Sequence, residues 1–198
     1  MIGLPSPLGE PVAVDRALDH VFGLVLVNDW SARDIQAWEY QPLGPFLGKS
    51  FATSIGHWVL PLAAARQRRV AAPPQDPQPL PYLREDPWAF DLPLEVELNG
   101  EVVARTNARH LYWSVAQQVA HLTVNGAALR TGDLLASGTI SGPERDQRGS
   151  FIELTWNGAE PLELGDGTTR TFLEDGDEVV LRGADLGEVR GRVISSGA

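Results

Sequence analysis

The chain has 198 residues, no cysteine and a formal net charge of −10. At about 150 residues per domain, this length predicts one domain that buries a core without cross-links. The lack of cysteine excludes disulfides, thiolate metal sites and thiol nucleophiles within these residues. The excess of carboxylates argues against nucleic acid or an anionic membrane as a partner. No targeting segment is visible, and the most apolar stretch is far shorter than the roughly 20 residues of a membrane helix, so a soluble cytoplasmic protein is expected.

The N-terminal third predicts short strands around one helix. Residues 1–20 predict a loop, a short edge strand and a helical turn. Residues 21–27 are apolar and β-branched, which predicts a buried strand. Ser31 and Asp34 have the spacing of a capping box, so a helix is expected over residues 31–40, ended by Pro42. A second apolar strand is expected around residues 58–60.

The rest of the chain predicts a mainly β structure. The proline-rich residues 66–93 predict a surface excursion of one domain. Residues 94–104 alternate around an Asn-Gly pair, which predicts a type I′ hairpin. Residues 113–126 predict a helix ended by a second Asn-Gly pair. A second hairpin is expected over residues 151–164, then Asp-Gly turns and a strand over residues 164–183. The predicted fold class is therefore α+β, predominantly β, with a few short helices.

Polar residues gather just after the first apolar strand. Asp29 follows directly on that strand. Arg33, Gln36 and Tyr40 are spaced three and four residues apart, which places them on one face of the predicted helix. Together they are typical of a polar pocket wall. The alternative is a solvated helix face with an Arg–Asp pair.

Lys49 is the only lysine of the chain. The segment around it resembles the end of a phosphate-binding loop, but its two glycines enclose three residues where that loop has four. Nucleotide binding is therefore not expected. A lone lysine suits a site that needs a compact ammonium group. The alternative is a chance survivor of an arginine-rich composition.

Two further positions are candidates on local pattern alone. Thr139 lies between nearby glycines that would let the backbone approach a ligand, or it sits in a tight turn at a sheet edge. Strand alternation places Glu153 opposite its apolar neighbours, as a functional or a surface glutamate. The acidic run of Asp175, Asp177 and Glu178 lacks the twelve-residue calcium-loop pattern and predicts a hairpin turn.

Three segments together resemble the fumarylacetoacetase family: residues 22–62, 109–144 and 172–183. The resemblance runs from about residue 8 to the end of the chain. It implies a mixed β-sandwich roll, with residues 1–198 forming an incomplete C-terminal catalytic domain whose N-terminal partner domain would precede residue 1. It also implies a homodimeric, metal-dependent hydrolase. Such an enzyme cleaves a carbon–carbon bond of 4-fumarylacetoacetate, giving fumarate and acetoacetate in tyrosine and phenylalanine catabolism.

The resemblance also implies a role for each candidate residue. Asp29 would be one of four carboxylates that hold Mg²⁺ or Ca²⁺, with Lys49 and Thr53 lining the surroundings of the metal. Arg33, Gln36 and Lys49 would stabilise the carbanion, while Gln36, Tyr40 and Thr139 would contact the substrate. Glu153 would orient a general-base histidine. That histidine and the other three carboxylates are expected before residue 1. The alternatives are a truncated, non-catalytic remnant, or a related enzyme acting on acylpyruvates or similar keto acids.

Overall fold

The computed structural model describes residues 1–195 and 197, and it confirms an α+β fold built mainly of short strands. The strands are β1 (Gly23–Leu24), β2 (Val27–Asp29), β3 (Thr53–Ile55), β4 (Leu60–Pro61), β5 (Arg69–Ala71), β6 (Trp88–Phe90), β7 (Pro93–Leu98), β8 (Glu101–Asn107), β9 (Leu162–Glu163), β10 (Thr169–Arg170), β11 (Glu178–Gly183) and β12 (Gly187–Arg192). The α-helices are α1 (Arg33–Leu43), α2 (Leu47–Ser50), α3 (Leu62–Ala65), α4 (Val115–Thr123) and α5 (Phe151–Leu154). Short 3₁₀ turns cover Ala17–His20, Arg66–Arg68, Pro81–Leu83, Ala108–His110 and Arg145–Gln147.

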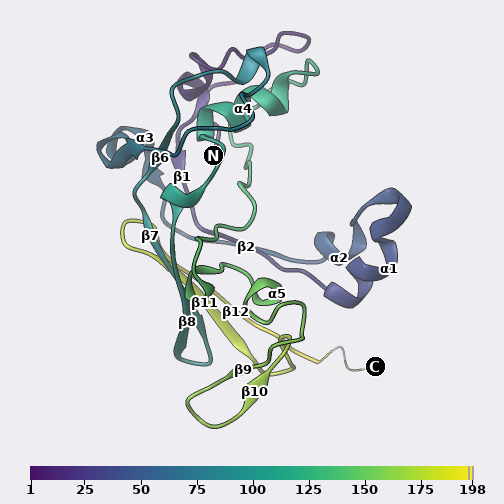
Figure 1. Cartoon of the computed structure of the whole chain (residues 1–198). Coiled ribbons are helices and arrows are strands. Elements are labelled where there is room, and N and C mark those ends of the chain that lie inside the picture. The colour runs from purple at the N-terminus through teal and green to yellow at the C-terminus, as the bar shows by residue number, and fades with distance from the viewer. Residues whose placement is uncertain (196, 198) are drawn as a thin grey trace.

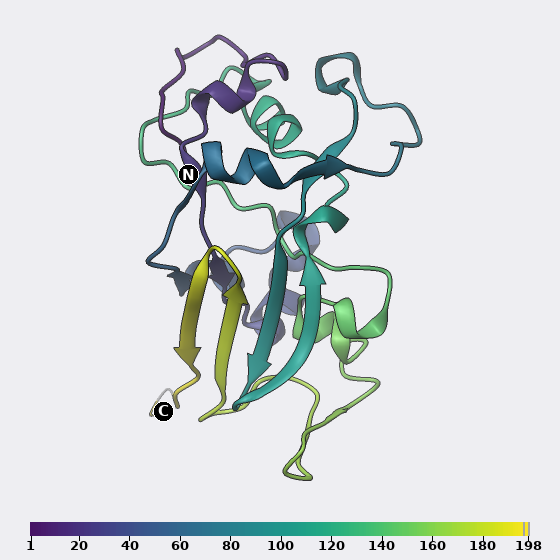
Figure 2. The ribbon, with the colours of Figure 1, turned by 90° about the vertical axis from the view of Figure 1, so that its left-hand side faces the viewer.

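A four-stranded antiparallel sheet in the order β12-β11-β7-β8 forms the centre of the molecule (Figures 1 and 2). β7 and β8 form the predicted hairpin, and both turn residues have positive φ, 51° at Asn99 and 88° at Gly100. Positive φ at both positions is what a type I′ turn requires, so that prediction is confirmed. The remaining strands pair as two-stranded ribbons.

The main hydrophobic core lies beside one end of this sheet, under α4. The predicted helix over residues 113–126 is confirmed: the Ser114 hydroxyl caps α4, and Gly126 follows it with a φ of 86°. Ala116 and Val119 of this helix are buried against residues of the N-terminal segment, the proline-rich excursion and the sheet. The excursion returns to this body, as expected. None of the described helices is both long and apolar enough to cross a membrane.

The predicted strand over residues 21–27 is wrong as one element. The segment divides into β1, which pairs with β4, and β2, which pairs with β3. Leu26 between them is buried, and its carbonyl accepts the Gly56 amide at 2.9 Å. The apolar run therefore contributes one strand to each of two separate ribbons. The second strand is also shorter than predicted, since it begins only at Leu60 and Trp58 stays exposed.

The predicted hairpin over residues 151–164 is also wrong. Phe151–Leu154 forms the helical turn α5, and positive φ values at Trp156 and Asn157 reverse the chain there. The cause lies in Thr155, which is fully buried and whose hydroxyl hydrogen-bonds to the carbonyls of Phe151 and Thr171. With these contacts the segment turns inward, and residues 151–154 form no ladder. Glu153 accordingly lies on a helical turn and not on a strand.

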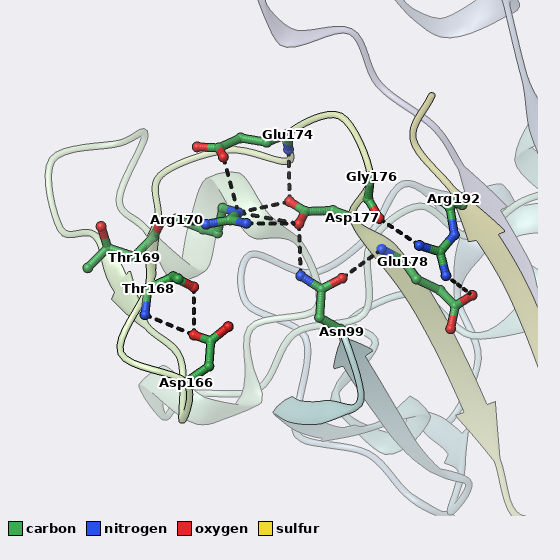
Figure 3. Close-up of polar contacts among 10 residues, drawn as sticks. All are labelled: Asn99, Asp166, Thr168, Thr169, Arg170, Glu174, Gly176, Asp177, Glu178 and Arg192. Atoms are coloured by element: carbon green, nitrogen blue, oxygen red, sulfur yellow. Dashed lines mark hydrogen bonds and ion pairs between the residues drawn. The ribbon is translucent and has the colours of Figure 1, made fainter. Parts of the chain in front are cut away.

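A buried ion pair, Arg170–Asp177, lies at the end of the sheet where β7 turns into β8 (Figure 3). Asp177 is 3% exposed, and its carboxylate accepts hydrogen bonds from the Arg170 guanidinium, the Asn99 amide and the Glu174 backbone N–H. Burial raises the pKa of Asp177, but these donors outweigh burial and hold it below its ordinary value. The acidic run forms a turn, but the predicted hairpin is wrong, because β10 pairs with β9 while β11 pairs with β7 and β12. Asp177 instead ties this turn to the β7–β8 hairpin through Asn99.

We expect Asp177→Asn to lower the free energy of unfolding by about 3 kcal/mol, because it leaves the Arg170 guanidinium without its buried charged partner. Urea denaturation measures this. Glu174→Gln is the matched control, since Glu174 contacts the same guanidinium but is largely exposed, and it should cost well under about 1 kcal/mol. Because the folded pKa is lowered, the stabilisation is present above the ordinary pKa and fades as pH falls through the folded value. Equal losses in the two variants would contradict the assignment.

Candidate active site

The helices α1 and α2 stand out from the body of the molecule at the end of the β2–β3 ribbon (Figure 1). We call residues 33–50, which comprise both helices, the arm. The predicted helix is present, but it begins at Arg33, and its N-cap Ala32 offers no side-chain hydrogen bond. The predicted capping box of Ser31 and Asp34 is therefore wrong. The backbone at Gln41 leaves the helical region just before Pro42, as the proline predicted.

Lys49 and Asp29 form an ion pair where the arm joins β2. The Lys49 Nζ lies 2.9 Å from Asp29 Oδ2 and donates to Ser31 Oγ at 2.7 Å. The Ser31 hydroxyl in turn donates to the Asp29 carbonyl at 3.2 Å. Both ionic side chains are only partly buried, so the pair stays open to a ligand. Ser31 therefore orients the lysine and does not cap the helix.

Arg33, Gln36 and Tyr40 lie on the side of α1 that faces the cleft. Arg33 Nη1 donates to Gln36 Oε1 at 2.8 Å, which fixes the two planar groups relative to one another. Burial lowers the pKa of Arg33, while the negative charges of Glu153 and Asp29 oppose this lowering. The guanidinium is thus near carboxylates from two separate segments. This is the pocket wall that the helical spacing predicts.

Glu153 is held by serine hydroxyls from two sides. Ser150 Oγ donates to Glu153 Oε2 at 2.5 Å, and Ser141 Oγ lies 3.0 Å from the same oxygen. Ser141 Oγ also accepts the Gly149 N–H at 3.0 Å, so one hydroxyl links two segments. A methyl group on Gly149 would lie 2.2 Å from the Ile140 carbonyl oxygen, which shows how closely these backbones approach.

One open cleft of about 1940 Å³ brings most of the candidates together. Its lining includes six of the predicted residues: Asp29, Arg33, Gln36, Tyr40, Lys49 and Thr139. Thr53 and Glu153 are not on the lining. Thr53 is the cross-strand partner of Asp29 in the β2–β3 ribbon, and Glu153 lies just behind the Ser150–Ile152 wall. Two cations and an amide therefore face a shared space, an arrangement that can stabilise a developing negative charge.

The described residues do not by themselves form a metal centre. No group of three His, Cys, Asp or Glu side chains suited to a metal occurs among them. Asp29 supplies one carboxylate, already paired with Lys49, whereas Mg²⁺ or Ca²⁺ takes at least six oxygen ligands. No histidine of the described residues lines the cleft either.

Sequence reasoning missed the residues that hold the others in place: Ser31, Glu39, Ser141 and Ser150. None of these roles has a local sequence signature, because each depends on a partner in another segment. Glu39 receives its role from the start of α2, where Phe46 offers no side-chain cap.

The fold is α+β, and the cleft places cations, an amide and a partly buried carboxylate on one wall, as expected of a domain that binds a small polar molecule. Residues 4–194 match the profile described as fumarylacetoacetate (FAA) hydrolase, C-terminal. The chain belongs to this family.

Relatives support the assignment. The fumarylacetoacetase of Homo sapiens is 52% identical over 194 residues, and that of Arabidopsis thaliana is 54% identical over 195. These matches cover 94% and 95% of this chain but 46% of each relative, so the chain spans about half the length of the relatives it matches.

Solved structures share the fold. A fumarylacetoacetate hydrolase from Exiguobacterium antarcticum superposes with a TM-score of 0.61 at 20% identity, covering 98% of this chain and 53% of that one. A fumarylpyruvate hydrolase from Pseudomonas aeruginosa, in complex with Mn²⁺ and pyruvate, gives a TM-score of 0.57 at 23% identity, covering 98% and 64%. At these identities the likeness concerns the fold alone.

We expect Gly149→Ala to destabilise the fold by about 1–3 kcal/mol, because the added methyl has no space against the Ile140 carbonyl. Urea denaturation measures the loss. Gly56→Ala is the control: its methyl would meet atoms at an ordinary 3.5 Å, so it should be neutral or slightly stabilising. If Gly149→Ala were as mild as the control, the close approach of the two segments would be disproved.

Proposed function

We propose that this chain is a fumarylacetoacetase-type C-terminal catalytic domain spanning residues 1–198. In the proposed reaction, water cleaves a carbon–carbon bond of 4-fumarylacetoacetate, giving fumarate and acetoacetate in tyrosine and phenylalanine catabolism. The observation that carries the proposal is the convergence of Asp29, Arg33, Gln36, Tyr40, Lys49 and Thr139 on one cleft, with the family membership beside it. A cytoplasmic location and a homodimer are parts of the same proposal.

The proposed roles follow from the charges that face the cleft. When the carbon–carbon bond breaks, its electron pair stays on the acetoacetate fragment as an enolate, which then takes up a proton. Arg33 and Lys49 are positively charged and Gln36 supplies amide donors, so they are proposed to stabilise this negative charge. Tyr40 and Thr139 are proposed to contact the substrate, together with Gln36. Glu153, held by its two serines, is proposed to orient the water-activating base.

The proposed cation is Mg²⁺ or Ca²⁺, with Asp29 as one ligand and Lys49 and Thr53 near it. Such an ion, when bound, polarises carbonyl oxygens as a Lewis acid. The described residues supply too few carboxylates to hold it alone. The other ligands in this proposal come from outside these residues, and the roles above stand without the ion.

Release of fumarate tests the function. The 198-residue chain is incubated with 4-fumarylacetoacetate, with and without Mg²⁺ or Ca²⁺, alone and with the separately expressed N-terminal half of human fumarylacetoacetase. Fumarate release in any of these reactions supports the proposal. Turnover of an acylpyruvate alone favours the related keto-acid enzyme, and no turnover of either substrate favours the non-catalytic remnant.

We expect Lys49→Ala to lower kcat by about 10²-fold or more with the fold intact, because one preorganised donor to the enolate is lost. Initial rates and thermal unfolding together check this. Arg16→Ala is the control, since Arg16 is an exposed cation with its own carboxylate partner, Asp19 at 2.9 Å. Unchanged turnover in Lys49→Ala would disprove the carbanion role.

We expect millimolar Mg²⁺ or Ca²⁺ to leave the melting temperature of the isolated chain unchanged, because one paired carboxylate binds a hard dication weakly. Differential scanning calorimetry measures this, with Asp29→Asn as the control. A rise in melting temperature that is absent in Asp29→Asn would show that these residues hold the cation by themselves.

A further inference from the structure

Glu39 is a buried carboxylate that the proposed reaction does not use. It lies on α1 and is only 8% exposed. Its oxygens accept the backbone N–H groups of Phe46 at 2.6 Å, Leu47 at 3.0 Å and Gly48 at 2.8 Å. Burial raises the pKa of Glu39, but these three donors outweigh it and keep the pKa below its ordinary value.

These donors are the N–H groups at the start of α2, which have no partner within the helix. α2 has no side-chain cap of its own, so a carboxylate from another helix takes that place. A negative charge also interacts favourably with the N-terminal end of a helix. One side chain therefore determines where α2 begins.

Gly48 shows how tightly α2 is then pressed onto α1. A methyl group on Gly48 would lie 2.9 Å from both the Ala32 carbonyl oxygen and the Gln36 nitrogen. The Ala32 N–H also donates to the Gly48 carbonyl at 2.9 Å. The backbone at Gly48 is thereby fixed against the first turn of α1, one residue before Lys49.

We propose that Glu39 is a positioning residue that sets the Lys49 ammonium against Asp29 and Ser31 by holding α2 against α1. The Glu39 carboxylate accepts the Gly48 N–H, and Lys49 is the next residue in the chain. The Lys49 Nζ lies 2.9 Å from Asp29 and 2.7 Å from Ser31. The inference rests on the proposed function for the use of that ammonium, and it concerns the geometry that makes the use possible.

Because Lys49 is the only lysine, its amine can be followed without substrate. The chain is treated briefly with an amine-reactive ester, and the rate of Lys49 acylation is measured by peptide mass spectrometry, apart from that of the N-terminal amine. In Glu39→Gln we expect this rate to rise several-fold toward that of Asp29→Asn, in which the ion pair is removed directly. Asp34→Asn is the matched control, since Asp34 is an exposed carboxylate on the same helix.

Gly48→Ala is a second variant that keeps the Glu39 carboxylate but pushes α2 away from α1. It should also speed Lys49 acylation. Each variant is labelled well below its own melting temperature, so that unfolding does not expose the lysine. In turnover assays, Glu39→Gln should lower kcat while KM changes little, because Glu39 holds α2, whereas the proposed substrate contacts Gln36 and Tyr40 are on α1 and Thr139 is on another segment.

Fast acylation in both variants at an intact fold supports the inference. Acylation of Lys49 at the original rate in Glu39→Gln or in Gly48→Ala would overturn it. The labelling result is separate from the proposed function, because a released Lys49 in a chain that never hydrolyses 4-fumarylacetoacetate would refute the function and leave the positioning intact.

Discussion

Two tryptophans packed on two glycines join the site to the sheet. An added methyl group would lie 2.4 Å from the Trp30 ring at Gly191 and 2.5 Å from the Trp58 ring at Gly187, both on β12. The Trp30 indole also donates to Ser54 Oγ at 2.9 Å, which ties it to β3. Larger residues at Gly187 and Gly191 would displace these two rings. Since Trp30 follows Asp29 directly, this contact determines where the carboxylate of the site lies.

Carboxylates are in excess in this chain, and the structure satisfies the buried or half-buried ones in different ways. Asp177 pairs with a guanidinium and Asp29 with an ammonium, whereas Glu39 accepts hydrogen bonds from backbone amides and Glu153 from serine hydroxyls. Burial of an unpaired charge costs several kcal/mol, so the buried Asp177 and Glu39 need their partners most. Of the four, the Asp29 pair lies on the cleft wall and is partly exposed. It is the pair that a ligand can reach.

Local patterns predicted the elements whose stability is local. The Asn99–Gly100 turn and the Ser114 cap were readable because each structure is decided by a few neighbouring residues. The helical spacing of Arg33, Gln36 and Tyr40 likewise placed them on the cleft. Local pattern singled out Lys49 and Thr139 only as separate candidates, and the family resemblance implied that they serve one site.

The errors arose where distant contacts decide the structure. Alternation in residues 151–156 favoured a strand, but the buried Thr155 hydroxyl bonded to Thr171 folds this segment as a helical turn. The Ser31 spacing favoured a cap, but the ammonium of Lys49, eighteen residues away, donates to that hydroxyl. Tertiary partners override local preference in both cases, and no single-sequence pattern encodes the partner.

The proposed reaction needs two functions, and the residues that line the cleft suit one of them. Arg33, Gln36 and Lys49 can stabilise negative charge, whereas the described lining includes no histidine that could take a proton from water. Hydrolysis of a carbon–carbon bond needs both functions, because the enolate forms only after a water nucleophile has been activated. In the proposed reaction this chain therefore stabilises the leaving carbanion. Glu153, fixed behind the wall by Ser141 and Ser150, is the group through which a base supplied from outside these residues would be oriented.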